Sequence, residues 1–248
     1  MKRWIQGGLF FLIAAQPAIA SIVLVQAQRS TAASYDYAGA PADSSDNAGH
    51  TADHLAALSH VAEVFTPGGT PRVYSRAQQD STLATTSIVG SGAALVDANV
   101  GPGNIASVAA QSRFSLTFDV LAPIEFVLDY ELSATLDTAA DALAGGFSNV
   151  SLLGPGGSIL SVELSNFAGV IGGPIAAIEA GTLTPGQYTL NAEANQLLDV
   201  AAPHFLGSGQ SSFNVSLTFV PEPSAALLFG ALVIVARPAR RSRVRAAG

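Results

Sequence analysis

The chain has 248 residues, a formal net charge of −7 and no cysteine. The lack of cysteine excludes disulfides, thiolate metal sites and cysteine nucleophiles, so a folded body must be stabilised by its apolar core. All 18 acidic residues but only three basic ones lie between residues 31 and 223, which gives this stretch a formal charge of −15. Because so acidic a body repels nucleic acid, we expect no nucleic-acid partner.

The beginning of the chain has the pattern of a cleaved signal peptide. Two positive charges follow Met1, and an apolar run over residues 5–15 comes next. Small residues at Ala18 and Ala20 occupy the two positions that signal peptidase reads, and a second such site ends at Ala27. The pattern predicts a signal peptide over residues 1–27, with cleavage after Ala20 or Ala27.

The next part of the chain, residues 28–71, contains few large apolar groups. Alanine, serine, aspartate and glycine dominate residues 30–54, a composition that buries little surface. Apolar residues then recur at helical spacing from Leu55 to Phe65. We therefore predict a low-complexity segment over 28–71 with one short helix, from Asp53 to Val64.

Residues 72–220 alternate between apolar and polar side chains, as strands with one buried face do. Short strands are expected at 73–74, 86–89 and 93–96, with a turn at Val100–Asn104. Clear alternation follows in five runs: 113–120, 125–137, 160–165, 188–195 and 212–219. Turns with glycine and proline separate the runs, at Gly154–Gly157 and, as a type II turn, at Pro185-Gly186. The prediction is an all-β fold, an antiparallel β-sandwich. The stretch Pro185–Leu190 also resembles strands in jelly-roll modules of secreted bacterial proteins.

The last 28 residues, 221–248, combine three features in order. Pro221, Glu222 and Pro223 come first, and an uncharged apolar run over 225–236 follows. Five arginines end the chain: Arg237, Arg240, Arg241, Arg243 and Arg245. Dense positive charge after an apolar helix stops transfer through a membrane and stays in the cytoplasm. Twelve residues of helix cover only about 18 Å of a hydrocarbon core about 30 Å thick, which suits a segment that is held briefly. A permanent single-pass anchor is the alternative.

These three features together resemble the PEP-CTERM sorting signal of Gram-negative bacteria. The resemblance implies processing by exosortase, a membrane-embedded cysteine transpeptidase whose substrates are typically exported proteins of bacteria that make exopolysaccharide. It also implies that the Pro-Glu-Pro tripeptide is the recognition motif and that the arginines are the cytoplasmic stop.

Motifs of catalysis and metal binding are incomplete. His50, His54 and His60 have the spacing of the three ligands of metzincin zinc proteases, but Thr51 replaces the general base and Ala57 replaces the glycine. The chain has no Gly-x-Ser-x-Gly elbow and no phosphate-binding loop. We therefore expect no enzyme activity, no metal site and no cofactor.

The function that these observations favour is that of an exported envelope protein. It would be held in the inner membrane with its body in the periplasm, then released to the cell surface or the extracellular matrix. Signal peptidase, exosortase and exopolysaccharide would be its partners, and its role would be structural. One alternative is a carbohydrate-binding module, and a more distant one is a secreted hydrolase. A carbohydrate-binding module needs exposed aromatic side chains. The stacking candidates are Tyr35, Tyr37, Tyr74, Tyr130 and Tyr188, of which the last two are predicted to be buried.

Overall fold

The computed structural model describes residues 21–39, 42–67, 72–138, 143–167, 172–200 and 205–220. These residues form twelve β-strands and no helix. The strands are β1 (Ile22–Ala38), β2 (Ser44–Ala52), β3 (Leu58–Phe65), β4 (Arg72–Leu83), β5 (Ser87–Val100), β6 (Ile105–Val120), β7 (Ile124–Thr138), β8 (Leu143–Gly154), β9 (Gly157–Phe167), β10 (Gly172–Leu183), β11 (Gly186–Val200) and β12 (Phe205–Val220). The predicted signal-peptide core, the cleavage residues Ala18 and Ala20, the Pro-Glu-Pro motif and the arginine tail lie outside the described residues.

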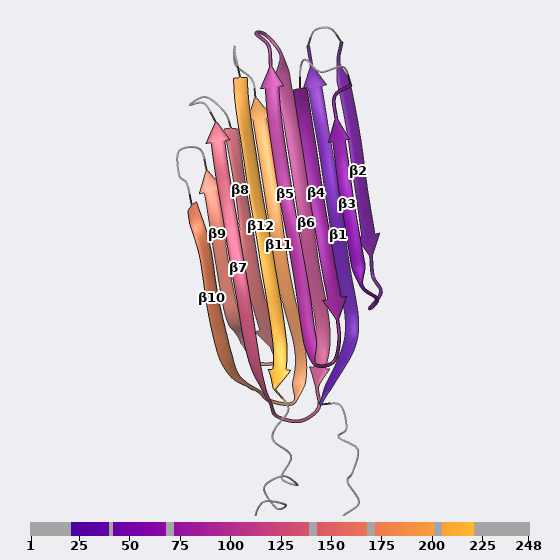
Figure 1. The fold of residues 1–248 in the computed structure, drawn as a ribbon, viewed down its shortest axis with the longest axis vertical. Helices are drawn as coiled ribbons and strands as arrows, with labels where there is room; N and C mark the ends of the chain where they lie inside the picture. The colour runs from indigo at the N-terminus through magenta and orange to yellow at the C-terminus, as the bar shows by residue number, and fades with distance from the viewer. Residues whose placement is uncertain are drawn as a thin grey trace, which may run out of the picture. The chain divides into compact units, whose positions relative to one another are not determined.

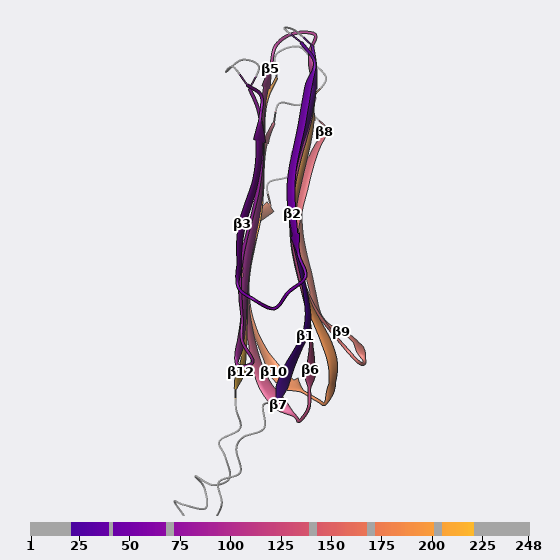
Figure 2. The same cartoon turned by 90° about the vertical axis from the view of Figure 1, so that its right-hand side faces the viewer.

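The strands pair into two six-stranded sheets that face each other (Figures 1 and 2). Sheet 1 has the order β2-β1-β6-β11-β8-β9, and sheet 2 has the order β10-β7-β12-β5-β4-β3. Neighbouring strands within both sheets are antiparallel. The predicted antiparallel sandwich is therefore confirmed.

The core forms where the alternating apolar side chains of the two sheets meet. In β6, Phe114, Leu116 and Phe118 are at most 1% exposed, and the polar residues between them face outward. The ring of Phe118 stacks on Tyr188 of β11, with centroids 5.7 Å apart, and meets the edge of Phe219 of β12 at 5.4 Å. Aromatic pairs in this geometry add to the burial energy. All five alternating runs of the sequence lie inside strands, namely β6, β7, β9, β11 and β12.

Two strands lie where the sequence shows no clean alternation. β8 begins with small residues, and β10 contains Pro174 among glycines and alanines. Proline is tolerated in β10 because this strand lies at the edge of sheet 2, where one side of the strand has no hydrogen-bonding neighbour. Pairing with β11 and β7, respectively, holds these strands in their sheets.

The prediction for residues 28–71 was wrong. This part of the chain forms most of β1 and all of β2 and β3, and the expected helix from Asp53 to Val64 is a link followed by a strand. Alternating side chains of β1, such as Ala33, Tyr35 and Tyr37, are buried between the two sheets although they are small or carry a polar group. In β3, inward Ala62 and Val64 follow a period of two, and pairing with β4 outweighs the local helical spacing.

The body therefore begins at β1 and not at residue 72. Ile22 is 2% exposed and pairs with Val120 at the end of β6. Residues 20–220 form one compact unit. Since β1 runs through Ala27, the second predicted cleavage site falls inside a strand of the core sheet.

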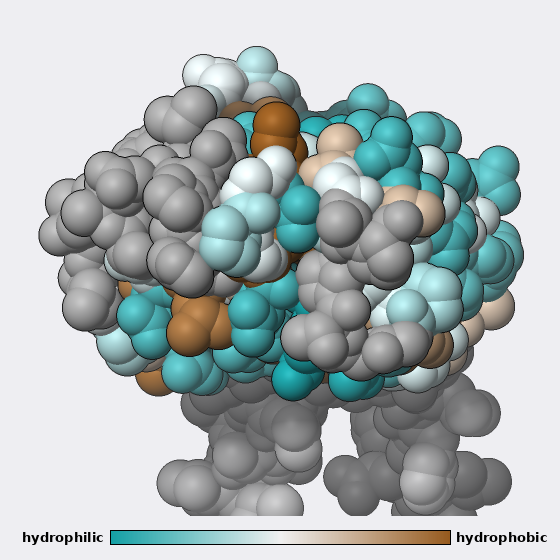
Figure 3. All heavy atoms as spheres, turned by 90° about the horizontal axis from the view of Figure 1, so that it is seen from above, coloured by the Kyte–Doolittle hydropathy of each residue, from teal (hydrophilic) through white to brown (hydrophobic). Residues whose placement is uncertain are grey.

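The first and last strands meet the same end of the sandwich. β1 starts at Ile22 beside Val120, and β12 ends at Val220 beside Glu125. Only the short link 121–123 separates Val120 from β7. We call this the terminal end. The opposite end, which carries the turn predicted at Val100–Asn104, is the far end; its described surface is mainly hydrophilic, with scattered hydrophobic residues (Figure 3).

The two predicted glycine turns differ in kind. Gly154 and Gly157 close a hairpin between β8 and β9, as expected, and Gly157 has a φ of +107°. The stretch before Gly186 instead joins β10 of sheet 2 to β11 of sheet 1. Gly186 has a φ of +152°, whereas a type II turn places its glycine near +80°, so the predicted turn type was wrong.

A buried arginine fastens the link between β2 and β3, which crosses from one sheet to the other (Figure 2). Arg29 of β1 is 1% exposed. Its Nη1 donates to the carbonyl oxygen of Ala56 at 2.7 Å and to Oγ of Ser81 in β4 at 2.8 Å. Its Nη2 donates to the carbonyl oxygen of His54. The guanidinium thus connects the link to both sheets, and burial lowers the pKa of Arg29 from its usual high value.

Two histidines stack across the same edge of the sandwich. The rings of His50 in β2 and His60 in β3 have centroids 4.3 Å apart and are inclined by 16°. Nδ1 of His60 lies 2.9 Å from Oγ1 of Thr31. Burial lowers the pKa of His60, and the neighbouring His50 lowers it further.

This arrangement predicts that the fold loses stability as pH falls. The pKa of His60 is about 6.5 in an unfolded chain and lower in the native state, so the unfolded state binds the proton first. The loss of folding free energy begins near the pKa of His60 in the unfolded chain and is complete below its pKa in the native protein. We expect urea midpoints to drop as the pH falls through about 6.5, the unfolded pKa, and to drop less in His60→Gln. An unchanged pH dependence in His60→Gln would show that this histidine is not the responsible group.

Candidate functional site

The histidines that had metzincin spacing do not form a metal centre. His50 and His60 present stacked rings, and Nδ1 of His54 lies 3.2 Å from Nη2 of Arg29, which is a cation. Among the described residues, no group of three or more histidines and carboxylates is placed to hold a metal ion. These three side chains instead make contacts at the edge of the sandwich where β2 connects to β3.

The tyrosines divide into four buried side chains and one that reaches the surface. Tyr130 and Tyr188 are buried, as predicted, at 5% and 3% exposure. Tyr35 and Tyr37 are buried as well. Only Tyr74 is partly exposed, on the outer face of sheet 2.

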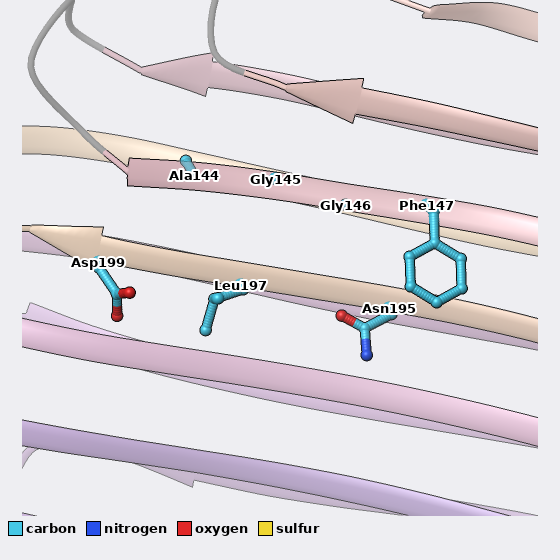
Figure 4. Close-up of a pocket in the computed structure, with 7 residues that line it drawn as sticks. All are labelled: Ala144, Gly145, Gly146, Phe147, Asn195, Leu197 and Asp199. Atoms are coloured by element: carbon cyan, nitrogen blue, oxygen red, sulfur yellow. The ribbon is translucent and has the colours of Figure 1, made fainter.

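A hollow of about 340 Å³ lies on the outer face of sheet 1, near the far end (Figure 4). Strands β8 and β11 form it, and we call it the Phe147 hollow. Its lining residues are Ala144, Gly145, Gly146, Phe147, Asn195, Leu197 and Asp199. Figure 4 shows the side chains of Phe147, Asn195, Leu197 and Asp199 on the same side of the two strands.

The register of sheet 1 explains why the surface is hollowed here. Leu197 pairs with Gly145 on one side and with Ala109 of β6 on the other. Since neither neighbour has a side chain longer than a methyl group, Leu197 is left 43% exposed as an apolar floor. Phe147, paired with Asn195, forms one wall.

Polar groups surround this apolar floor. Asp199 accepts a hydrogen bond from Oγ of Ser107 at 2.6 Å. The side-chain amide of Asn195 has no hydrogen-bond partner among the described residues, so its donor and acceptor are both available. An aromatic wall, an apolar floor and a few oriented polar groups are the usual elements of a small-molecule binding surface.

Beside the hollow, a short polar network connects β6 and β11. Glu193 accepts from Nε2 of Gln111 at 2.8 Å and pairs with Nε of Arg113 at 3.1 Å. The sequence predicted that Glu193 and Asn195 are polar outward residues of a strand. It did not single out Phe147, because only the pairing of β8 with β11 brings this ring beside Asn195.

The described residues include no helix with the length and hydropathy of a membrane span. They also show where each expected site lies in relation to the body. Pro221 follows directly on Val220, the last residue of β12, and Ala20 precedes β1 by one residue, Ser21. The cleavage, tripeptide and arginine residues themselves are outside the described part.

No protein-family model matches the chain, and no curated protein matches it. Among solved structures, the enzymatically active domain of bacteriophage CBA120 tailspike protein 4 is 13% identical, with a TM-score of 0.24; 67% of this chain and 19% of that chain are covered. A carbohydrate-binding module of the β-sandwich superfamily is 8% identical, with a TM-score of 0.19 and coverage of 81% and 98%. Infectious bursal disease virus, Gx strain, is 9% identical, with a TM-score of 0.14 and coverage of 87% and 73%. Likenesses this low assign no function to this chain.

Proposed function

We propose that this protein is an exported, jelly-roll-like β-sandwich that exosortase sorts to the cell surface or matrix, where it has a structural role without catalysis. The observation that carries the proposal is the position of the two terminal signals relative to the body. The strands occupy residues 22–220, the small-residue cleavage site ends at Ala20, and Pro221 follows the last strand at once. Both signals can therefore be removed without cutting a strand.

The position of β1 also selects between the two signal-peptidase sites. Cleavage after Ala20 leaves β1 whole. Cleavage after Ala27 would remove buried Ile22 and Ala27 itself, which is 0% exposed. Since burial of a large aliphatic side chain contributes about 2 kcal/mol, we propose that the signal peptide ends at Ala20.

Mass spectrometry of the mature protein tests this proposal. The expected N-terminus is Ser21, and the expected C-terminus lies within or close to the Pro-Glu-Pro tripeptide, with the arginines absent. A cytosolic protein that keeps Met1 and the arginine tail would contradict export and sorting together. A mature N-terminus at Gln28 would contradict only the choice of cleavage site.

Carbohydrate binding is a second candidate function, and the Phe147 hollow is the observation that favours it. A sugar ring has an apolar C–H face and a rim of hydroxyl groups. Phe147 and Leu197 offer an apolar surface for the face, and Asn195 and Asp199 offer hydrogen bonds to the rim. Retardation of the protein in gels that contain a neutral polysaccharide measures this function, and Phe147→Ala should weaken it.

A further inference from the structure

The outer face of sheet 2 carries an aromatic pair that the function proposed so far does not use. Phe65 at the end of β3 is 61% exposed. The register places it directly beside Tyr74 of β4, the one tyrosine that is partly exposed. Cross-strand neighbours on one face have Cβ atoms about 5 Å apart, so the two aromatic side chains stand next to each other on the outer face of sheet 2.

Polar residues extend this aromatic surface across the sheet. Tyr74 pairs with Asp97 of β5, Asp97 with Ser208 of β12, and Ser208 with Asp137 of β7. We call these four residues, together with Phe65, the Phe65 row. The row crosses five strands and, at about 4.8 Å per strand, spans about 19 Å. That length accommodates several sugar units of a linear chain.

The end of the row away from Phe65 is hollowed. A cavity of about 530 Å³ lies there, lined by Leu95, Thr135, Leu136, Asp137, Ser208, Gly209 and Gln210. Arg72 pairs with Asp97 at 3.5 Å and holds this carboxylate beside Tyr74. Within the described part of the chain, the side chains of Tyr74, Ser208 and Asp137 have no hydrogen-bond partner. They are free to bind hydroxyl groups of a ligand.

The charge of the body narrows the class of ligand. Residues 31–223 carry a formal charge of −15, and two of the five residues of the row are aspartates. An anionic polysaccharide would be repelled by this field. The aromatic rings of the row can pack against the C–H faces of sugar units, and its carboxylates can accept hydrogen bonds from their hydroxyl groups. These features fit a neutral polysaccharide.

The Phe65 row and the Phe147 hollow lie on opposite faces of the molecule. They belong to the outer sides of two sheets whose inner sides face each other (Figure 2). Both are near the far end: Asp199 pairs with Ser107 close to the start of β6, and Tyr74 pairs with Asp97 close to the end of β5. From Ser208 to Val220, β12 covers about 40 Å, so both surfaces are well separated from the terminal end.

We propose that the Phe65 row binds a neutral polysaccharide chain and that, with the Phe147 hollow, it makes this protein a bridge between two such chains. The inference rests on carbohydrate binding at the Phe147 hollow, the second function proposed above. One sandwich then holds two polysaccharide molecules on opposite sides and links them. Each contact is individually weak, and a matrix gains strength from many bivalent links.

The test compares binding and cross-linking in the mature protein purified after export. Binding is measured by retardation in native gels that contain dextran, galactomannan or hydroxyethylcellulose, with alginate as the anionic comparison. Cross-linking is measured as turbidity and viscosity of the retarding polysaccharide in solution. The variants are Phe147→Ala, the double variant Phe65→Ala/Tyr74→Ala, and the triple variant. Ile178→Ala is the matched control, because Ile178 is 68% exposed on the outer face of sheet 2 but lies on β10, at the opposite edge from β3.

We expect the wild type and Ile178→Ala to be retarded by a neutral polysaccharide and to cross-link it. The double variant and Phe147→Ala should each keep partial retardation, while turbidity falls at least about tenfold, since each retains one of two contacts. The triple variant should show neither effect. Unchanged thermal melting of the variants shows that they are folded.

Three results would overturn the bridge. Cross-linking by the double variant at the wild-type level would remove the Phe65 row from the proposal and leave binding at the Phe147 hollow intact. No retardation of the wild type by any neutral polysaccharide would refute both the hollow and the bridge. A wild-type dimer that the double variant converts to a monomer, measured by light scattering, would show that the row binds a second copy of this chain instead.

Discussion

Replacing Arg29 by alanine is expected to lower the free energy of unfolding by about 3 kcal/mol. The guanidinium donates to the carbonyl oxygens of His54 and Ala56 and to Oγ of Ser81. Removing it leaves these acceptors without a donor at a position that is 1% exposed in the native protein. The link between β2 and β3 would lose its attachment to both sheets. Urea unfolding at neutral pH measures the effect.

Arg72→Ala is the matched control for this prediction. Arg72 pairs with Asp97 at 3.5 Å, but its side chain is 64% exposed, and exposed ion pairs contribute about 0 to 1 kcal/mol. Equal losses of stability in the two variants would contradict the role given to Arg29. A third variant, Arg29→Met, separates packing from hydrogen bonding, because methionine fills the space without donating. If Met is tolerated and Ala is not, the space that the side chain fills is the main contribution.

Changing all five C-terminal arginines to serine is expected to reduce the processed, surface-displayed protein by at least about tenfold. The variant replaces Arg237, Arg240, Arg241, Arg243 and Arg245. Placing one arginine at the centre of a membrane costs about 3 kcal/mol, so a cluster of them behind an apolar run halts transfer strongly. Serine removes this barrier, and the body should be released with its Pro-Glu-Pro region uncut.

The control for this experiment keeps the charge and changes the side chain. Five lysines in place of the five arginines should preserve most of the processing, since lysine is also a stop-transfer charge. Mass spectrometry of the C-terminus and surface labelling of cells provide the readouts. If the serine variant were processed and displayed like the wild type, the stop-transfer role of the arginines would be wrong.

Local pattern was sufficient to predict strands where large apolar residues alternate with polar ones. In β6, Phe114, Leu116 and Phe118 could only form a buried strand face, and the structure confirms it. The pattern failed from Ile22 to Phe65, where inward positions hold alanine, threonine and tyrosine. Small residues carry a weak hydrophobic signal by themselves. Here they are buried because pairing of β1 with β6 and of β3 with β4 places them on the inner faces of the two sheets.

The candidate surfaces depended even more on tertiary pairing. Tyr74 was one of three tyrosines that were not predicted to be buried, and the burial of the other two, Tyr35 and Tyr37, distinguishes it. Phe65 followed directly on the predicted helix from Asp53 to Val64, and nothing in the sequence placed it beside Tyr74. No local pattern singled out Phe147, because only the pairing of β8 with β11 places it beside Asn195.

The amino-acid sequence by itself determined that this chain has a signal-like start, an acidic body of alternating strands and an apolar, arginine-rich end. It determined these because composition and period are local properties. Only the tertiary structure decided that residues 22–71 belong to the body, that both terminal strands meet one end, and that aromatic surfaces lie on two opposite faces. A period of two tells which side chains share a face of a strand, but it does not tell which strands become neighbours. That choice is made by packing between residues far apart in the chain.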